Sequence, residues 1–312
     1  MTLVFQVIAA FVLDLILGDP RPYPHPVKII SKIARTGESF TRRLFRNQKL
    51  AGIITTLSVI IISYFGIFFI IDLLGKLHPF AGIASSIFFI YSTLSIRSLF
   101  DESLPVFKFL KEENLPEARK SLSNIVGRDT ENLDEEGIVR ATVETVAEST
   151  VDGIISPLFY AVIGGAPMAM AYKAANTMDS LFGYKNEKYI EFGWGSARLD
   201  DLANWLPARL SVPLMTVAAA VCGLNGSKAW TIANRDGRKH PSPNAGFPEA
   251  AMAGALGIQL GGINHYSGIE NHKPLLGDSG QKLEIKYIIQ SQKLMFISSF
   301  LAMLVLLAYV SI

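Results

Sequence analysis

The chain has 312 residues, of which 50% are hydrophobic and only 18% are charged. An ordinary soluble domain has about 25% charged residues, so this composition favours an integral membrane protein over a large soluble helical protein. The formal net charge of +2 gives no indication of nucleic-acid binding, and the single cysteine, Cys222, excludes an intrachain disulfide.

Six apolar segments follow one another along the chain, and Asp14 is the only charged residue in any of them. They are residues 3–17, 50–71, 80–96, 154–172, 210–227 and 294–312. About 20 apolar residues cross a bilayer, so most of these segments are long enough to span it or nearly so. The first lacks a basic start and a small-residue cleavage site, and we expect it to be a retained helix. The sequence predicts an all-α, polytopic membrane protein with a single membrane-embedded domain, residues 1–312.

The loop between the first two apolar segments predicts the orientation. Between residues 28 and 49 it carries seven basic side chains and one acidic side chain, Glu38. The positive-inside rule places this loop in the cytoplasm. Residues 97–150 would then also be cytoplasmic, as an amphipathic helical insert. The segment 154–172 holds two prolines and the pair Gly164–Gly165. We favour a bent or re-entrant segment there, with a full span as the alternative.

The stretch ETVAESTVDG, residues 144–153, spaces Glu144, Glu148 and Asp152 four apart. On an α-helix this spacing puts all three carboxylates on one face, where like charges repel by a few tenths of a kcal/mol per pair. A solvated helix face, with Arg140 offsetting Glu144, is one interpretation. The other is a catalytic Mg²⁺ site, because Mg²⁺ prefers carboxylate oxygens and bridges to substrate phosphates.

Three further stretches concentrate polar residues, and we expect them to bind substrate or phosphate. A Pro-rich turn after the first segment contains His25. The loop 173–209 offers Lys173, Asn176, Asp179, Tyr184, Lys185, Arg198, Asp200 and Asp201. The stretch from residue 234 offers Arg235, Arg238, Lys239, His240 and Asn244 beside a predicted helix start at Pro248. A loop that only sets membrane topology is the alternative for this basic cluster. The chain has no G-x-x-x-x-G-K-[ST] phosphate loop and no H-E-x-x-H motif.

Six motifs together resemble the adenosylcobinamide-phosphate synthase family of cobalamin biosynthesis, the CbiB/CobD type. They are LGDPRPYPHPV, IVGRDT, VETVAESTVDGIISPLFY, AYKAANTMDSLFGYKNEKY, FGWGSARLDDLANWLPARL and DGRKHPSPNAGFPEAAMAGALG. The similarity runs in order from about residue 10 to residue 262. Ser149 departs from the pattern, where the family motif has Asn. Residues 263–312 match no motif of the family.

The resemblance implies an enzyme of the cell membrane that joins adenosylcobyric acid to an amino-alcohol phosphate, usually (R)-1-aminopropan-2-yl phosphate. The product is adenosylcobinamide phosphate, and the reaction as usually written consumes ATP and requires Mg²⁺. The motif loops would face the cytoplasm. Expected partners are the lipid bilayer, these substrates, and either a second copy of the chain or other late cobalamin-pathway membrane enzymes. A membrane transporter and a non-catalytic signalling protein of related fold are the alternatives.

Overall fold

The computed structural model describes residues 2–19, 25–184, 186–266 and 268–310. Two predicted features lie outside these ranges: Lys185, and residues 20–24 of the Pro-rich turn. The described chain is predominantly helical, which confirms the all-α prediction. The α-helices are α1 (Leu3–Leu17), α2 (Pro26–Leu44), α3 (Gln48–Leu77), α4 (Pro79–Tyr91), α5 (Ile96–Lys111), α6 (Leu115–Ser123), α7 (Glu135–Thr150), α8 (Ser156–Phe182), α9 (Trp194–Ala203), α10 (Trp205–Val221), α11 (Gly226–Asp236), α12 (Gly246–Leu256) and α13 (Lys286–Val310).

Two short helical turns of other types connect these helices. A π-helical turn, Val151–Ile155, joins α7 to α8, and a 3₁₀ turn, Gly237–Lys239, follows α11. Helix α12 begins at Gly246, two residues before the predicted start at Pro248. A wider π turn changes the direction in which successive side chains point. The α-helical spacing that stacks Glu144 and Glu148 therefore ends before Asp152, which lies inside the π turn.

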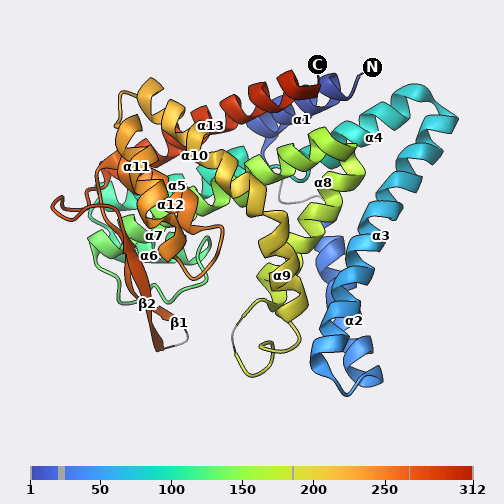
Figure 1. Cartoon of the computed structure of the whole chain (residues 1–312), viewed down its shortest axis with the longest axis horizontal. Helices are drawn as coiled ribbons and strands as arrows, with labels where there is room; N and C mark the ends of the chain where they lie inside the picture. Colours follow the sequence, from blue (N-terminus) through green and yellow to red (C-terminus); the bar gives the residue numbers. More distant parts are fainter. Residues whose placement is uncertain (1, 20–24, 185, 267, 311–312) are drawn as a thin grey trace. The chain divides into compact units, whose positions relative to one another are not determined.

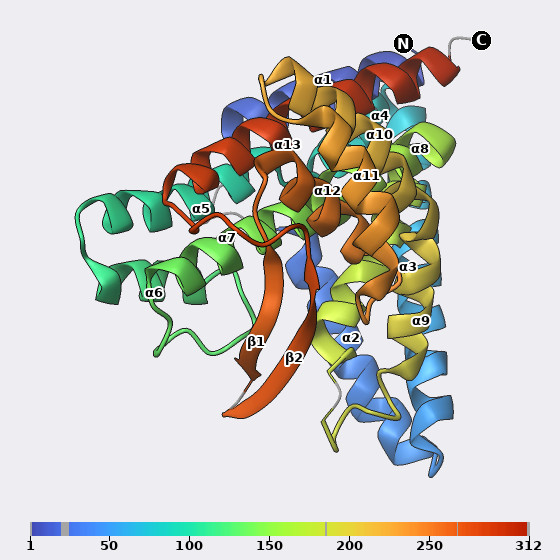
Figure 2. The same ribbon diagram turned by 60° about the vertical axis from the view of Figure 1, so that its left-hand side comes forward.

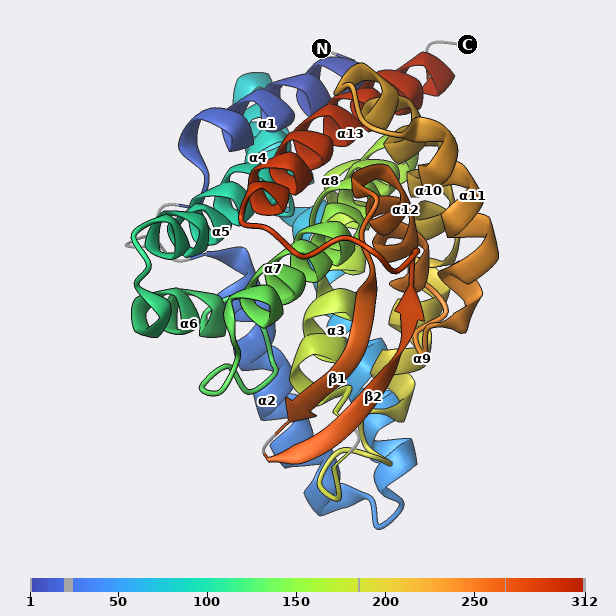
Figure 3. The same cartoon turned by 90° about the vertical axis from the view of Figure 1, so that its left-hand side faces the viewer.

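A β-hairpin interrupts the helical pattern, formed by β1 (Leu260–Tyr266) and antiparallel β2 (Ile269–Leu276). Figures 2 and 3 show the two strands lying side by side as a two-stranded sheet. We expected helices throughout, and that expectation is wrong here. Gly261 and Gly262 both have φ of 89°, a conformation that glycine adopts at little cost and that no α-helix contains. Helix formation cannot continue through this pair.

The chain forms two compact units, each built from separate stretches of sequence. Unit 1 holds the chain up to Ser95, Asp152–Asn204, and the chain from Val305 onward. Unit 2 holds Ile96–Val151 and Trp205–Leu304. Residues 97–150, expected as an insert, thus form the first stretch of unit 2.

Unit 1 is organised around α3. Helices α2, α4, α8 and α9 pack against it, and Figure 1 shows α2 running beside the first half of α3. A Cβ atom at Gly52 would lie only 1.8 Å from the carbonyl oxygen of Phe192, so the close approach to the residues before α9 requires glycine there. Inside α8, Gly164 and Gly165 leave helical geometry, with φ of 65° at Gly165. The bend predicted in segment 154–172 is confirmed, and the side of the membrane to which the chain returns stays a prediction.

Unit 2 is organised around α7 and α12, whose side chains are largely buried. Helices α5 and α6 pack on α7, and α10 and α11 pack on α12. Helix α13 is attached to α5, where the rings of Phe100 and Phe296 lie 5.5 Å apart and Gln292 donates a 2.8 Å hydrogen bond to Ser103. Helices α5 and α6 have the polar outer face expected of this region, but α7 belongs to the core.

Among the residues that the structure describes, four helical stretches are long and apolar enough to cross a membrane. They are Gln48–Leu77, Pro79–Lys111, Glu135–Phe182 and Lys286–Ala308, and Leu3–Leu17 and Trp205–Val221 are shorter apolar helices. In α3 the large side chains of the second half, such as Phe65, Phe69 and Leu73, are exposed. Exposed apolar surface of this extent suits contact with lipid. The structure is that of a polytopic membrane protein.

Candidate functional site

The centre of unit 2 contains a buried ion pair between α7 and the loop before it. The Nη2 atom of Arg128 lies 2.5 Å from Oε2 of Glu144, and the two side chains are only 6% and 1% exposed. The backbone N–H of Gly261 donates a 2.8 Å hydrogen bond to the other oxygen of Glu144. Arg128 also donates to Asn264 of β1, over 2.7 Å. Burial alone would lower the pKa of Arg128, but the charge of Glu144 raises it above its ordinary value.

Beside this pair, three further titratable groups meet at one point. Oε1 of Glu249 lies 3.8 Å from both Nζ of Lys273 and Nε2 of His240. These separations exceed hydrogen-bonding distance, and neither carboxylate oxygen of Glu249 has a hydrogen-bond partner among the described residues. Burial raises the pKa of Glu249 well above its usual range, and burial lowers that of His240 to about 4. His240 is therefore neutral near pH 7.

Lys273 supplies a second positive charge to the acidic face of α7. Burial opposes its charge, but Glu249, Glu144 and Glu148 raise its pKa above the ordinary value. The chain thus places Arg128 and Lys273 around the carboxylates for which the sequence predicted a metal ion.

The three predicted carboxylates have different surroundings. Glu144 accepts hydrogen bonds from Arg128 and Gly261, Glu148 is exposed, and Asp152 lies in the π turn. Within the described ranges, no group of three or more His, Cys, Asp or Glu side chains is arranged to hold a metal ion. A Mg²⁺ site at these three residues stays a prediction, as does the involvement of Mg²⁺ in the reaction.

The predicted basic cluster is largely neutralised by one buried acid, Asp236. Arg235 donates to both of its oxygens, at 2.8 and 2.6 Å, and Nζ of Lys239 lies 2.6 Å from Oδ1. These hydrogen bonds lower the pKa of Asp236 below its usual range. Arg235 also pairs with Asp278 at 2.8 Å. Arg238 is exposed and has no ion pair with any carboxylate of the described residues, so it is the cation of this cluster best placed to meet a ligand.

Unit 1 contains a second polar cluster, in which amides and hydroxyls surround carboxylates. Asn176 donates to Asp200 at 3.2 Å and to Asp152 at 3.4 Å. Asn204 donates to the other oxygen of Asp200 at 3.0 Å. The carbonyl oxygen of the Asn204 side chain accepts from Ser156 at 2.6 Å and from Tyr172 at 2.9 Å. The structure thus brings together Asn176, Asp200 and Asp152, three residues that the sequence had singled out in three different motifs.

Asp200 has an unusual proton affinity for a carboxyl group. Burial, together with the nearby charge of Asp179, raises its pKa from an ordinary 3.8 to about 7. Lys173 of α8 is half-buried close by, and the charges of Asp14, Asp19, Asp152 and Asp200 all act on it. A carboxyl group that titrates near neutral pH can exchange protons with a substrate at that pH.

The other predicted residues of unit 1 lie at its surface or at helix ends. Arg198 and Asp201 form an ion pair of 3.6 Å on α9. Tyr184 is exposed. His25 caps the start of α2 by accepting from the N–H of Val27 and lies 3.3 Å from Asp19.

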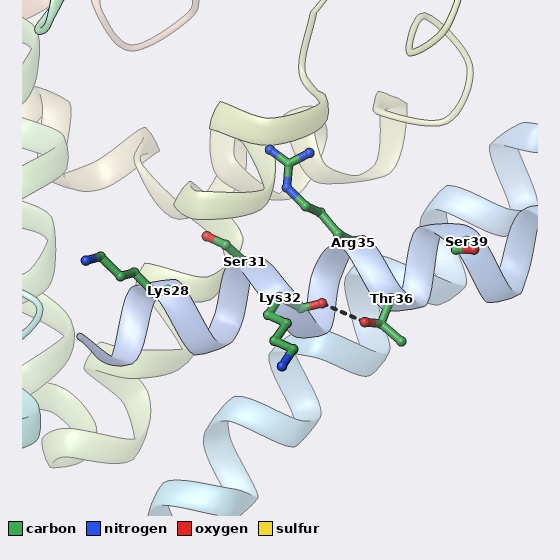
Figure 4. A pocket seen from close by; sticks show the side chains of 6 residues that line it. All are labelled: Lys28, Ser31, Lys32, Arg35, Thr36 and Ser39. Atoms are coloured by element: carbon green, nitrogen blue, oxygen red, sulfur yellow. Dashed lines mark hydrogen bonds between the residues drawn. The ribbon is translucent and has the colours of Figure 1, made fainter. Parts of the chain in front are cut away.

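The basic face of α2 borders a shallow surface pocket, lined by Lys28, Ser31, Lys32, Arg35, Thr36 and Ser39. In Figure 4, Lys28 and Arg35 point to one side of the helix and Lys32 to the other. The three cations therefore do not converge on one ligand position, and their arrangement agrees with a topogenic role.

Sequence reasoning missed several members of both clusters, although most stood inside the quoted motifs. Arg128 belongs to IVGRDT, Glu249 to GFPEAAMAGALG and Asn204 to LDDLANWLPARL. For Glu249 the available indication was an acid followed directly by the uncharged stretch AAMAGALG. Lys273 lies in a region without any motif, and only its strand position opposite Gly262 brings it to the cluster.

Comparisons with known proteins agree over nearly the whole chain. The family described as "CobD/Cbib protein" matches residues 7–295. The cobalamin biosynthesis protein CobD of Leptospira interrogans is 50% identical over 292 residues, covering 94% of this chain and 93% of the relative. CobD of Clostridium perfringens is 48% identical over 303 residues, with 97% and 96% covered. Cobalamin biosynthesis protein CbiB of Salmonella typhimurium is 45% identical over 302 residues, with 96% and 95% covered. No solved structure matches the chain.

Proposed function

Because the chain belongs to the CobD/CbiB family of cobalamin biosynthesis proteins, we propose that it catalyses the ATP-dependent joining of adenosylcobyric acid to an amino-alcohol phosphate. The amine would be (R)-1-aminopropan-2-yl phosphate and the product adenosylcobinamide phosphate. The family resemblance in six motifs supports this reaction, and the role in cobalamin biosynthesis follows from the matched relatives. Mg²⁺ would accompany ATP, and no residue is assigned to hold it.

Forming an amide from a carboxylate and an amine has two chemical requirements: the carboxylate must be activated, and the amine must lose a proton. A carboxylate is a poor acylating group, so the terminal phosphoryl group of ATP would first pass to the propionate oxygen, giving an acyl phosphate and ADP. The amine nitrogen then attacks the carbonyl carbon, the C–N bond forms, and the C–O bond to phosphate breaks. The substrate enters as an ammonium ion, which must first lose one proton to free its lone pair. The second N–H proton leaves with the phosphate.

One observation carries the assignment of a site: the position and proton affinity of Asp200. It is buried, held by Asn176 and Asn204, and titrates near pH 7. A proton acceptor works best when its pKa lies near the working pH. We assign to Asp200 the acceptance of the ammonium proton. Lys173 and Asn176, which lie around it, would hold the carboxylate or phosphate groups of the substrates.

The experiment that tests this function uses purified protein in nanodiscs with ATP, adenosylcobyric acid and the amino-alcohol phosphate. We expect adenosylcobinamide phosphate and ADP in equal amounts. Asp200→Asn should lower kcat by about 10²–10⁴-fold, the usual contribution of a general base. Asp201→Asn, its neighbour on the same helix, is the matched control and should stay within a few-fold of the parent. No product from the intact protein would refute the ligase assignment.

The two alternatives predict different results in the same preparation. A transporter would move the corrinoid or a phosphate metabolite across sealed vesicles without forming the amide bond. A signalling protein would bind its ligand and neither transport nor convert it. The carboxyl group of Asp200, tuned to titrate near neutral pH inside a network of hydrogen bonds, favours the enzyme.

We further propose that the protein is a multi-pass protein of the cell membrane with its motif loops in the cytoplasm, where ATP is found. The basic loop between residues 28 and 49 supports this orientation. Single cysteines at Lys188 and Lys239, in a Cys222→Ser background, should react only with reagents that reach the cytoplasm. Labelling of both positions from outside would reverse the orientation.

A further inference from the structure

An arginine outside the predicted basic cluster is held in place at the start of α10. The guanidinium carbon of Arg209 lies 4.2 Å from the ring centre of Trp205 and 4.7 Å from that of Phe247. Its Nη1 donates a 2.6 Å hydrogen bond to the carbonyl oxygen of Trp205. Arginine stacks on aromatic faces in this way while its remaining N–H groups stay available. These contacts therefore hold the guanidinium group of Arg209 in place, while no carboxylate of the described residues pairs with its positive charge.

Arg238 belongs to a different element whose backbone packs on the same ring. Gly237, directly before it, packs on Phe247 so closely that a Cβ atom there would lie 2.9 Å from the ring. The first residue of α12, Gly246, approaches the carbonyl oxygen of Gly237 more closely still, since its Cβ would lie 2.2 Å away. The start of α10, the 3₁₀ turn and the first turn of α12 thus meet around Phe247, with Arg209 over the ring and Arg238 in the turn that packs on it.

The unpaired charges at this meeting point are positive. Within the described ranges, no carboxylate lies at ion-pair distance from Arg209 or Arg238, whereas Asp236 neutralises Arg235 and Lys239. The charge of Arg238 acts on Arg209, and two like charges held close together destabilise the fold unless an anion lies between them. The first turn of α12 adds the positive end of a helix dipole. The acid in that turn, Glu249, is buried, and burial raises its pKa well above its usual range.

A membrane-interface anchor is the simpler explanation for part of this arrangement. Trp and Arg are common where a helix leaves the bilayer, and Trp205 is 51% exposed. That explanation accounts for Trp205 and Arg209. It does not account for Arg238, which comes from a separate turn whose glycine packs on the same ring and whose charge acts on Arg209.

We propose that Arg209 and Arg238 together bind the phosphate group of a phosphate-ester substrate. Guanidinium groups bind phosphate through paired hydrogen bonds, and two of them match the charge of a phosphate dianion. The proposal rests on the function proposed above, whose reaction brings two phosphate esters to the protein: the nucleotide and the amino-alcohol phosphate. The exposed indole of Trp205 offers a stacking surface that only the nucleotide could use.

Binding measurements on the full chain in nanodiscs of zwitterionic lipid test the proposal, because such discs contain no anionic headgroup as a competitor. The probes are inorganic phosphate, (R)-1-aminopropan-2-yl phosphate and ATP. The variants are Arg209→Gln and Arg238→Gln, with Lys282→Gln as control, since Lys282 is 77% exposed and contacts only Glu136 at 3.7 Å. We expect each arginine variant to raise the Kd of at least one phosphate ester tenfold or more and the control to change it less than twofold.

The pattern among the probes identifies the source of the phosphate. Loss of ATP binding alone, reproduced by Trp205→Leu, assigns the nucleotide. Loss of amino-alcohol phosphate binding alone, with Trp205→Leu unchanged, assigns the amine substrate. Unchanged Kd values in both arginine variants, or no binding of any probe by the parent, would overturn the proposal and leave the arginines as interface anchors. Arg238 is exposed and unpaired, so its variant should fold even if Arg209→Gln does not.

Failure of this proposal and failure of the proposed function give different results. If the parent forms the amide product but the arginine variants keep its KM for both phosphate esters, the reaction stands and the two-arginine site does not. If the parent forms no product but binds a phosphate ester in an arginine-dependent manner, the site stands and the reaction does not.

Discussion

The two polar clusters bury carboxylates by different means. In unit 2, Glu144 lies against the guanidinium of Arg128 at 2.5 Å, so a full positive charge offsets the buried negative one. In unit 1, Asp200 receives hydrogen bonds from two side-chain amides and forms no ion pair with an arginine or lysine of the described residues. Amide dipoles offset less of the desolvation cost than an opposite charge does. The first carboxylate is therefore tied to a fixed charge, whereas the second titrates near pH 7.

This difference separates a structural role from a chemical one. A buried ion pair holds elements together, and here it joins α7, the preceding loop and the hairpin. A carboxyl group that changes its charge near neutral pH is of little use as an anchor but well suited to proton transfer. We therefore expect mutations in unit 2 to reduce stability first, and mutations around Asp200 to change pH dependence first.

The largest expected effect is that of Arg128→Met. The substitution would leave the Glu144 carboxylate buried without a counter-charge, which usually destabilises a protein by about 3–5 kcal/mol. Thermal unfolding in detergent should show a marked fall in Tm. The double variant Arg128→Met/Glu144→Gln should recover part of the loss, because it removes the stranded charge. A Tm equal to that of the parent in the single variant would contradict the role of the ion pair.

Asp200→Asn should change the pH dependence of stability. The folded-state pKa of Asp200, about 7, is above its ordinary value of 3.8, so the folded protein holds the proton more tightly. Its contribution to stability is complete below about pH 3.8 and is lost as the pH rises to about 7, by roughly 2–4 kcal/mol. The variant should lack this decline. Tm measured from pH 5 to pH 8.5 checks it, and parallel curves for variant and parent would show that Asp200 does not titrate in this range.

Ser156→Ala tests the network that orients Asp200. The serine hydroxyl donates a 2.6 Å hydrogen bond to Asn204, which in turn donates to Asp200. Its loss should cost about 1–2 kcal/mol, the value of a buried hydrogen bond between neutral groups. The pH at which activity is half-maximal should also shift, because Asn204 would be held less firmly. An unshifted pH profile with lowered Tm would limit this serine to a packing role.

Glu249→Gln should have the smallest effect, less than about 1 kcal/mol. Burial raises the pKa of Glu249 well above its usual range, which favours the neutral acid, and a glutamine of the same shape would replace that neutral form without stranding a charge. Glu144→Gln in the same unit should cost more, since it leaves Arg128 unpaired. A loss of stability in Glu249→Gln as large as that in Glu144→Gln would show that Glu249 is ionised and pairs with Lys273.

Much of the fold could be predicted from composition and pattern. Uncharged runs of about 20 residues indicate membrane helices irrespective of what they pack against. The bend in α8 was predictable because Gly164–Gly165 and the neighbouring prolines break any helix. The hairpin at residues 260–276 was not, because its short strands carry no clear alternation and depend on contacts with α7 and α12.

The sequence by itself determined that the chain is a helical membrane protein, which family motifs it carries, and that acids and bases concentrate in those motifs. Only the tertiary structure decided which charged and polar side chains contact one another. Glu144 accepts from Gly261 and Arg128 donates to Asn264, partners separated by 117 and 136 residues. Spacing along a helix places Glu144 and Glu148 on one face, but it does not show that Arg128 and Lys273 approach that face. Electrostatic interactions act through space over a few ångströms, and chain folding alone sets those distances.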